Sequence, residues 1–281
     1  MPGTRSALRA PVTSTSDEAT ATARFHHRVD PRFVNAVRPF VRALRLLHPL
    51  RADGLTNVPK GPALLVGNHG LVGYETLLFF DLLEQHLGRL PIGLADRWFF
   101  KIPLVRSLLV RIGGTYGCPE NALDALANGD LVVCYPGGVR EVLKKTNEER
   151  YRLRWETSLG FARVAIRAQV PLVPFAAAGV DDTYRVLTTI DGSGEFLMGH
   201  AKYDLPLLWG AGPFPRPVRF WFRFGEPIPP GAPSEAHEDE DAVRALHAKA
   251  WSRTQTMLDE LVSAWRGAYE PTSLDPASIP A

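Results

Sequence analysis

The chain has 281 residues, of which 45% are apolar and 22% are charged. This composition is typical of a globular protein, and the chain is long enough to bury a core. Acidic and basic residues nearly cancel to a net charge of +2, so the overall charge selects no class of partner. The two cysteines, Cys118 and Cys134, have no paired spacing, which argues against a disulfide framework or a cysteine zinc site and favours a reducing compartment.

The composition of residues 1–24 predicts a disordered leader. They are rich in Ser, Thr, Ala and charged residues and lack the apolar central run of a signal peptide. The longest stretch free of Asp, Glu, Lys and Arg runs from Gly61 to Tyr74, shorter than the roughly 20 apolar residues of a spanning helix. We therefore expect no membrane span, one domain over residues 25–270 and a flexible tail over residues 271–281.

Two segments, residues 33–51 and 97–112, combine apolar residues at helical spacing with basic residues. Pro39 either kinks the first helix or marks its first turn, and Pro103 interrupts the second. Periodicity alone favours helices packed on the core, whereas the basic faces also fit docking to an anionic lipid surface. In the first segment the apolar positions are Phe33, Val37, Phe40, Val41, Leu44 and Leu47 and the basic ones Arg38, Arg42 and Arg45; the second carries Arg97, Lys101, Arg106 and Arg111.

Strands and helices alternate along the rest of the chain. Short continuous apolar runs predict buried strands, and longer periodic segments predict helices. This alternation predicts an α/β fold: a single domain with a mixed, largely parallel sheet flanked by helices, preceded by the N-terminal amphipathic helix. The expected strands are residues 63–66, 91–95, 131–135, 170–178 and 218–224, and the expected helices are residues 74–87, 121–128, 156–169 and 239–266.

A histidine flanked by glycines follows the first of these strands. The chain reads Gly67-Asn68-His69-Gly70-Leu71-Val72-Gly73-Tyr74-Glu75. In one continuous helix His69 and Glu75 would be about 120° apart, so they can meet only if the loop glycines let the chain curl back. A glutamate that accepts a hydrogen bond from one ring nitrogen leaves the other nitrogen able to take a proton. The alternative is an ordinary loop histidine beside an unrelated glutamate.

A second glycine loop follows the strand expected at residues 131–135. It reads Tyr135-Pro136-Gly137-Gly138-Val139-Arg140-Glu141. Paired glycines let the backbone approach a ligand, and their amides can form an anion-binding nest. Arg140 adds a positive charge suited to a thioester oxyanion or a polar head group. The alternative is a strand-to-helix turn with a surface salt bridge.

Taken together, in this order and at this separation, the two loops resemble the glycerolipid acyltransferase superfamily, whose first block is a histidine followed by an acidic residue. The chain is more similar to the branch that contains the type-two diacylglycerol acyltransferase relatives and the plant phytyl ester synthases. The likeness covers roughly residues 35–265. It is carried by Asn68-His69-Gly70, by Tyr135 to Glu141, by Trp155 through Pro174, and by Gly225-Glu226-Pro227-Ile228.

Three departures from the superfamily pattern bear on the substrate. The acid is Glu75, six residues after His69, where the commonest block has aspartate after five; the longer spacing is similar to the branch named above. Gly137 stands where enzymes with phosphorylated acceptors usually carry glutamate, and Pro119 lies near the position of their arginine. The resemblance therefore implies a neutral alcohol as acceptor.

The resemblance implies an O-acyltransferase that moves a fatty acyl group from a thioester to a lipid-like hydroxyl. His69 is expected to act as the general base and Glu75 to orient it. Acyl-CoA is the expected donor, with acyl carrier protein as competitor, and neither a metal nor a tightly bound cofactor is implied. Substrate binding and oxyanion stabilisation are assigned to Asn68, Gly70, Gly137, Gly138, Arg140 and Glu141. The protein is expected at the cytoplasmic surface of a membrane, bound peripherally to anionic lipid.

Two other functions use the same residues: a thioester hydrolase acting through His69, and a non-catalytic lipid-binding module. Other candidate sites are weaker. His26 and Asp30 form a His-x-x-x-Asp pattern beside the leader, and Ser193 lacks the spacing of a serine-hydrolase elbow. Cys134 is expected in the core, and Cys118 is a possible nucleophile without sequence support nearby. The sequence contains no phosphate-binding loop and no dinucleotide motif. The aromatic residues at 220–224 are expected to pack a strand and not to stack on bases, so no nucleic-acid partner is expected.

Overall fold

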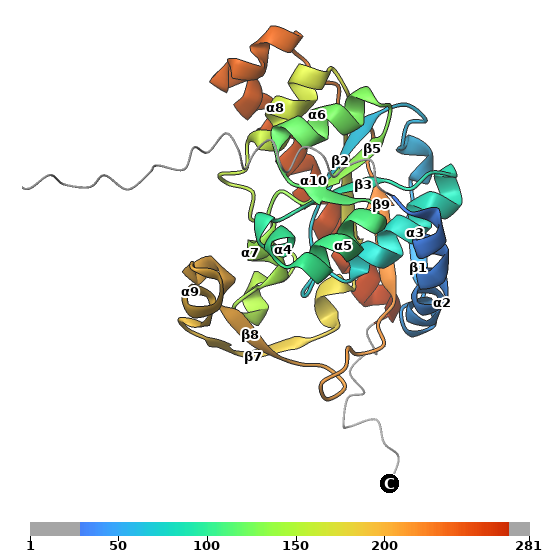
Figure 1. Ribbon diagram of the computed structural model, residues 1–281, viewed down its shortest axis with the longest axis vertical. Helices are drawn as coiled ribbons and strands as arrows, with labels where there is room; N and C mark the ends of the chain where they lie inside the picture. The colour runs from blue at the N-terminus through green and yellow to red at the C-terminus, as the bar shows by residue number, and fades with distance from the viewer. Residues whose placement is uncertain (1–28, 270–281) are drawn as a thin grey trace, which may run out of the picture.

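The computed structural model describes residues 29–269, so the leader predicted at 1–24 and the tail predicted at 271–281 lie outside the described residues. A seven-stranded sheet forms the centre, in the order β1-β9-β6-β2-β5-β3-β4. Neighbouring strands run parallel except β6 and β9, which are antiparallel. Helices lie on both faces of this sheet (Figure 1). The predicted single α/β domain, with a largely parallel sheet flanked by helices, is confirmed.

The main sheet consists of β1 (Leu50–Asp53), β2 (Ala63–Gly67), β3 (Ile92–Ala95), β4 (Gly114–Tyr116), β5 (Leu131–Cys134), β6 (Leu172–Ala178) and β9 (Phe220–Phe224). A second, antiparallel pair is formed by β7 (Arg185–Ile190) and β8 (Leu205–Trp209). The α-helices are α2 (Pro31–Leu47), α3 (Glu75–Leu87), α4 (Arg97–Lys101), α5 (Pro103–Arg111), α6 (Pro119–Ala127), α7 (Val139–Val142), α8 (Gly160–Ala168), α9 (Ser193–Met198) and α10 (Glu240–Tyr269). Short 3₁₀ turns occur at Leu55–Asn57, Asn147–Glu149, Val180–Asp182, Ala201–Tyr203 and Ser234–Glu238.

The core lies between the main sheet and the helices that pack on it. Every residue of β2 and β6 is buried. Phe79 of α3 stacks on Phe175 of β6 with ring centroids 4.5 Å apart, while α10 packs against β6 and β9. Strands that are covered on both faces are apolar throughout instead of alternating. This is why continuous apolar runs located β2, β5 and β6 in the sequence.

The central strands bring three distant loops together. Because β2 runs parallel to both β5 and β6, the carboxyl ends of these strands lie at one edge of the sheet. The loop after β2 carries His69, the loop after β5 carries Gly137, and the turn after β6 carries Asp181. In open α/β sheets, ligands bind at the carboxyl edge of the strands. This edge is therefore the expected location of a ligand-binding or catalytic site.

Helix α2 differs from the expected helix at both ends. The side chain of Asp30 accepts hydrogen bonds from two backbone N–H groups of the first turn and caps the helix, while His26 lies outside the described residues. Pro39 lies inside the helix and not in its first turn. The helix ends at Leu47, and residues 50 and 51, the end of the predicted helix, belong to β1, which pairs with β9.

Between β6 and β9 the chain leaves the main sheet. Residues 185–214, here called the excursion, contain β7, α9 and β8 and extend from one side of the molecule (Figure 1). None of these elements is predicted from the sequence, because most side chains of β7 are not buried and so show no core-facing period. The helix expected at 156–169 also differs, since it begins only at Gly160, after a turn.

Candidate active site

The loop after β2 curls back so that His69 meets Glu75, the first residue of α3. Nδ1 of His69 lies 2.6 Å from Oε1 of Glu75, which also accepts a hydrogen bond of 2.8 Å from the Gly70 amide. The curl runs through left-handed conformations at Val72 and Gly73, with φ of 69° and 76°. The side chain of Glu75 is 2% exposed and that of His69 is 14% exposed. The carboxylate is thus enclosed, and the imidazole reaches the surface.

Both loop glycines are required by close approach. A Cβ on Gly70 would lie 2.7 Å from the Cβ of Val180, and one on Gly73 would lie 2.9 Å from Cε1 of His69. Gly73 also has the positive φ that side chains rarely adopt. Glycine at these positions leaves room for the imidazole and for its carboxylate partner.

Val72 is the strained position in the loop. A β-branched residue with φ of 69° is an outlier, and such conformations cost about 1–3 kcal/mol each. The amide of Val72 donates to the carbonyl of Val142, and its side chain remains 47% exposed. Strained backbone conformations of this kind cluster at active sites and ligand-binding loops.

The surroundings of His69 favour a fixed orientation of its ring. Tyr135, at the end of β5, stacks on the imidazole with ring centroids 3.9 Å apart. Burial raises the pKa of Glu75, but the charge of His69 and hydrogen bonds from its ring and from the Gly70 amide outweigh this effect, so the pKa lies below its ordinary value. Glu75 is therefore ionised at neutral pH and can stabilise a protonated His69. Among the residues described, none hydrogen-bonds to Nε2 of His69, so this nitrogen can take a proton.

Asn68 and Glu141, both predicted to bind substrate, instead hold the protein together. The amide of Asn68 is 3% exposed and exchanges two hydrogen bonds with the backbone of Ala177 in β6. Glu141 is fully buried, and its two oxygens accept the backbone N–H groups of His69 and Arg154. With these polar atoms hydrogen-bonded inside the protein, both side chains position the loops.

The second glycine loop also differs from its predicted role. A Cβ on Gly137 would lie 2.2 Å from the carboxyl group of Glu141, so this glycine makes room for a neighbouring side chain. The amide of Gly138 donates to the carbonyl of Tyr135 within a turn, whereas no residue of the described chain accepts from the amide of Gly137. Of the two amides predicted to bind an oxyanion, the structure leaves only that of Gly137 available.

The side chain of Arg140 contacts the segment before α8. Its guanidinium donates to the carbonyl of Arg154 at 2.7 Å and to the hydroxyl of Ser158 at 3.4 Å, and it lies 3.9 Å from Glu156. These contacts tie α7 to the segment before α8. The role predicted for Arg140, contact with a thioester oxyanion, stays a prediction.

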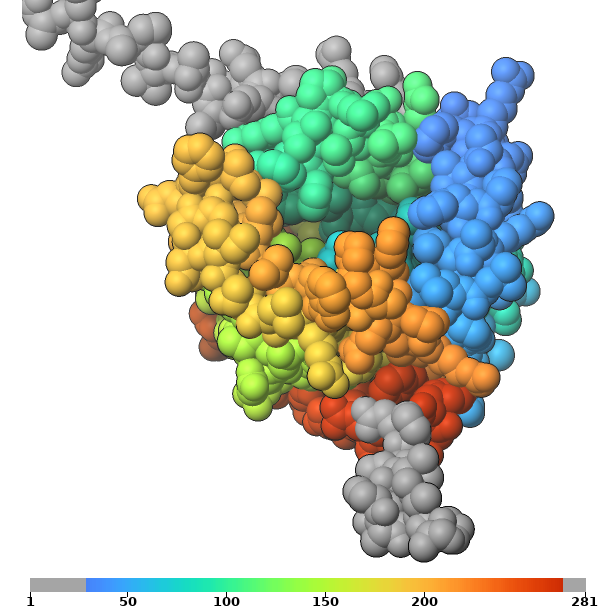
Figure 2. Space-filling view, turned by 90° about the horizontal axis from the view of Figure 1, so that it is seen from below, coloured from blue at the N-terminus to red at the C-terminus, as the bar shows by residue number. Residues whose placement is uncertain are grey.

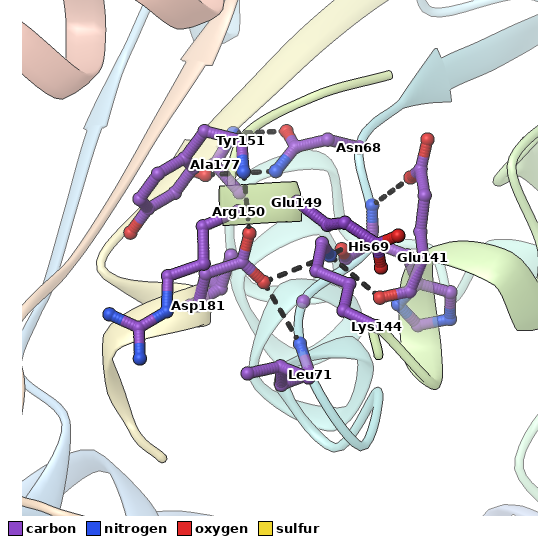
Figure 3. A network of polar contacts seen from close by, with 12 residues as sticks. Asn68, His69, Leu71, Glu141, Lys144, Glu149, Arg150, Tyr151, Ala177 and Asp181 are labelled. Carbon is purple, nitrogen blue, oxygen red and sulfur yellow. Dashed lines mark hydrogen bonds and ion pairs between the residues drawn. The ribbon is translucent and has the colours of Figure 1, made fainter. Parts of the chain in front are cut away.

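Lys144 and Asp181 are the site residues that sequence reasoning missed. They form a buried ion pair of 3.0 Å beneath the His69 loop (Figure 3). Lys144 follows the second glycine loop and Asp181 follows β6, so nothing in the local pattern of either segment marks them. Their partnership depends on three loops meeting in space.

A largely apolar cavity of about 270 Å³ lies next to the stacked Tyr135. Pro119 and both cysteines line it, and the surrounding protein raises the pKa of Cys134 to about 12 and that of Cys118 above its ordinary value. Protonated thiols are poor nucleophiles, so neither cysteine is activated for covalent catalysis. The other lining residues are Leu64, Leu94, Ala95, Asp96, Gly117, Ala122, Pro136, Gly138, Ser158, Gly160, Phe161 and Val164.

The described residues offer neither a metal site built from clustered side chains nor a membrane-spanning helix. Between residues 29 and 269, no cluster of three or more His, Cys, Asp or Glu side chains is arranged to hold a metal ion. No helix within the same residues has the length and apolar character needed to cross a membrane.

The family model that matches this chain is described as "Acyltransferase" and covers residues 49–178. The chain carries an acyltransferase-family segment. This segment includes the loops after β2 and β5 and ends with β6, so His69, Glu75 and Gly137 lie within it and Asp181 lies just beyond.

Similar proteins cover much of the same region. A Bos taurus protein described as a "DGAT1/2-independent enzyme synthesizing storage lipids" is 31% identical over 224 residues, which are 78% of this chain and 65% of the relative. Its Homo sapiens counterpart is 32% identical over 204 residues, 71% of this chain and 61% of the relative. An uncharacterized protein of Mycobacterium tuberculosis is 32% identical over 209 residues, 71% of this chain and 58% of the relative. The chain thus spans slightly less than two thirds of the length of these relatives.

Among solved structures, the 1-acyl-sn-glycerophosphate (LPA) acyltransferase PlsC from Thermotoga maritima is similar to this chain. The match covers 80% of this chain and 79% of that one, with a TM-score of 0.48 and 17% sequence identity.

Proposed function

We propose that the protein is an O-acyltransferase that esterifies a lipid-like, neutral hydroxyl from a fatty acyl thioester. The observation that carries the proposal is the contact of 2.6 Å between His69 and Glu75, inside the acyltransferase-family segment, with Nε2 of His69 left open. Acyl-CoA is the proposed donor, with acyl carrier protein as the alternative carrier. The storage-lipid synthesis named for the mammalian relatives supports a lipid acceptor.

The proposed reaction is a direct transfer. Nε2 of His69 takes the proton of the acceptor hydroxyl while the hydroxyl oxygen attacks the thioester carbonyl carbon. The new ester C–O bond forms, the C–S bond breaks, and the proton passes from His69 to the departing thiolate. Glu75 stabilises the protonated imidazole, and general-base assistance of this kind typically contributes about 100- to 10,000-fold. The amide of Gly137 is the proposed donor to the carbonyl oxygen as charge develops on it.

The proposal of a neutral acceptor rests on two positions. A glutamate at Gly137, as in phosphate-acceptor relatives, would force the side chain of Glu141 to move, because Glu141 fills the adjacent space. Pro119, near the position of their arginine, lines the apolar cavity beside Tyr135 and offers no charge to a phosphate. The cavity is instead suited to a hydrocarbon chain, because its lining is mostly apolar.

We also propose that the protein binds a lipid surface peripherally. In Figure 2, α2 in blue, α4 and α5 in teal, and the excursion in yellow to orange surround a hollow on one face. Each segment exposes large apolar side chains, including Leu46 at 86%, Leu104 at 72% and Phe196 at 88% exposure. Residues 31–47 and 97–111 contain arginine and lysine but no aspartate or glutamate, which complements an anionic surface.

The arginines of α2 do not act as one set in this binding. Arg38 pairs with Glu84 at 2.8 Å and Arg45 pairs with Asp81 at 3.1 Å, both on α3. Of the three arginines predicted to face lipid, only Arg42 is exposed. Co-sedimentation with anionic vesicles should therefore weaken as salt rises, and an Arg42→Ala variant should weaken it more than Arg38→Ala. Equal binding to neutral and anionic vesicles would contradict the electrostatic part of this proposal.

The test of the catalytic proposal uses labelled acyl-CoA with diacylglycerol, a long-chain alcohol and glycerol 3-phosphate in competition. Lipid extraction should recover label in the ester of a neutral acceptor. Label recovered only as free fatty acid would show a thioester hydrolase, and unchanged acyl-CoA would indicate a lipid-binding module. Preference for glycerol 3-phosphate would overturn the neutral acceptor but not the transfer.

A further inference from the structure

A lysine ammonium group is buried directly beneath the catalytic loop. The side chain of Lys144 is 2% exposed, and that of its partner Asp181 is fully buried. A lysine ammonium has three N–H donors, and here each has one acceptor: the carbonyl of His69 at 2.8 Å, the carbonyl of Glu141 at 2.6 Å and Oδ1 of Asp181 at 3.0 Å. The ammonium group therefore joins the loop after β2, helix α7 and the turn after β6 (Figure 3).

The carboxylate of Asp181 extends this junction. Its Oδ1 also accepts the backbone N–H of Leu71 at 3.1 Å, and its Oδ2 accepts that of Tyr151 at 2.8 Å. The ion pair thus holds the carbonyl of His69 and the amide of Leu71, the backbone groups on either side of Gly70. Glu141 holds the remaining backbone group of His69, its N–H, at 2.7 Å. The peptide groups around the histidine are fixed by buried side chains and not by secondary structure.

Resting on the proposed function, we propose that Lys144 and Asp181 are positioning residues for the reaction. They fix the backbone around Gly70 so that the imidazole of His69 reaches Glu75 and turns Nε2 outward. A loop that contains two glycines has many conformations of similar energy, so its catalytic geometry must come from such anchors. Replacing a buried ion pair with apolar residues is often neutral or stabilising, so stability alone gives little reason to bury this pair.

The next residue in the chain supplies a matched control. Lys145 also forms an ion pair, with Asp204 at 2.9 Å, but its side chain is 43% exposed and its partner follows α9. Within the described residues, no hydrogen bond or ion pair of the Lys145 side chain reaches the His69 loop. Lys144→Met and Lys145→Met therefore remove the same charge from adjacent positions, and only the first removes an anchor of the histidine.

The experiment compares these two variants with the parent and with the double variant Lys144→Met/Asp181→Asn. Lys144→Met should lower kcat by about 100-fold, because a misplacement of about 1 Å costs that much, and leave KM within about threefold. Lys145→Met should keep the parental kcat. The double variant removes the unpaired buried charge, so its Tm should recover toward that of the parent while kcat stays low.

A second measurement does not depend on turnover. With ¹⁵N-labelled histidine, the ring nitrogens of His69, assigned by their loss in His69→Ala, should show a proton fixed on Nδ1 in the parent and in Lys145→Met. This signature should be lost or averaged in Lys144→Met. A parent that shows the signature without acyl transfer would sink the proposed function and leave the positioning intact. The positioning is overturned if Lys144→Met keeps the parental signature, or if kcat recovers with Tm in the double variant.

Discussion

The His69 loop and the excursion are both irregular parts of the chain, and they are built in opposite ways. In the loop, buried side chains of Glu141, Lys144 and Asp181 bind the backbone on both sides of the catalytic candidate. The excursion instead exposes apolar side chains, among them Phe196 at 88% and Phe214 at 70%. Internal polar contacts therefore fix the backbone at the proposed catalytic site, whereas the exposed apolar side chains lie where the protein is proposed to bind a lipid surface. Substitutions in the two regions should therefore separate turnover from surface binding.

The largest effect is expected at the histidine itself. His69→Ala should abolish ester formation, since no described side chain can replace the base. It should also lower the free energy of unfolding by about 1–3 kcal/mol, because the buried carboxylate of Glu75 loses a partner. Ester formation and thermal unfolding are to be measured on the same preparation, together with vesicle binding, which should not change. Transfer that persists in the folded variant would remove His69 from the mechanism.

A smaller loss is expected when the charge beside the histidine is removed. Glu75→Gln keeps the size of the side chain but no longer stabilises a protonated imidazole, so kcat should fall by roughly 10- to 1,000-fold. Steady-state rates at saturating acyl-CoA measure this effect. A Glu84→Gln variant on the same helix is the control: it removes a carboxylate that pairs with Arg38 and not with His69, so it should keep the parental kcat. Parental turnover in Glu75→Gln would mean that the contact of 2.6 Å has no part in catalysis.

The excursion should show the reverse behaviour. Phe196→Ser with Leu197→Ser removes two exposed apolar side chains, and fully burying each in lipid would contribute about 1.5–3 kcal/mol. Vesicle binding should weaken at least about tenfold, since about 1.4 kcal/mol corresponds to a factor of ten. Turnover of a short-chain acyl-CoA in solution should stay at the parental value. Trp251→Ser on α10 removes an exposed aromatic side chain from another part of the molecule and should leave binding unchanged.

If vesicle binding survives the excursion variant, sedimentation of the protein alone shows whether the exposed side chains join two copies of the chain. A dimer that dissociates in this variant would assign the excursion to self-association. The proposed lipid contact of the excursion would then be wrong, and the role proposed for the His69 loop would be unaffected.

The smallest effect is expected at Val72. Val72→Gly removes the strain of a β-branched residue with positive φ but adds freedom to the unfolded chain, so the free energy of unfolding should change by less than about 1 kcal/mol. Differential scanning calorimetry measures this change. If the exposed side chain contacts the acyl donor or acceptor, KM should rise severalfold while kcat stays near the parental value. A fall in kcat alone would mean that Val72 holds the loop and does not contact substrate.

The sequence predicts the centre of the fold better than its edges. β2, β5 and β6 were identifiable because burial on both faces leaves an uninterrupted apolar run. The short outer strands β1 and β4 were not predicted, because no residue of β1 is fully buried and the three residues of β4 are too few to show a period. The excursion was not predicted, because its mostly exposed side chains produce no periodic pattern of buried apolar residues.

The site divides in the same way. The curl that joins His69 to Glu75 could be inferred, because the histidine, its glycines and the carboxylate lie within one short segment. The roles of Asn68 and Glu141 could not, because a polar side chain beside a catalytic residue can face either a ligand or another loop. That choice is made by Ala177 and Arg154, which are distant in the sequence. Lys144 and Asp181 become visible only once the loops are assembled.

The close packing of Gly137 against Glu141 constrains how this site could evolve. The superfamily resemblance implies that acceptors with a phosphate are served by glutamate at the position of Gly137. In this chain that single replacement would force Glu141 to move, because even a Cβ at Gly137 would lie 2.2 Å from the carboxyl group of Glu141. Changing Glu141 first would free the space but release the backbone N–H of His69. Either order first disturbs this packing or this hydrogen bond, so we expect substitutions at the two positions to be epistatic.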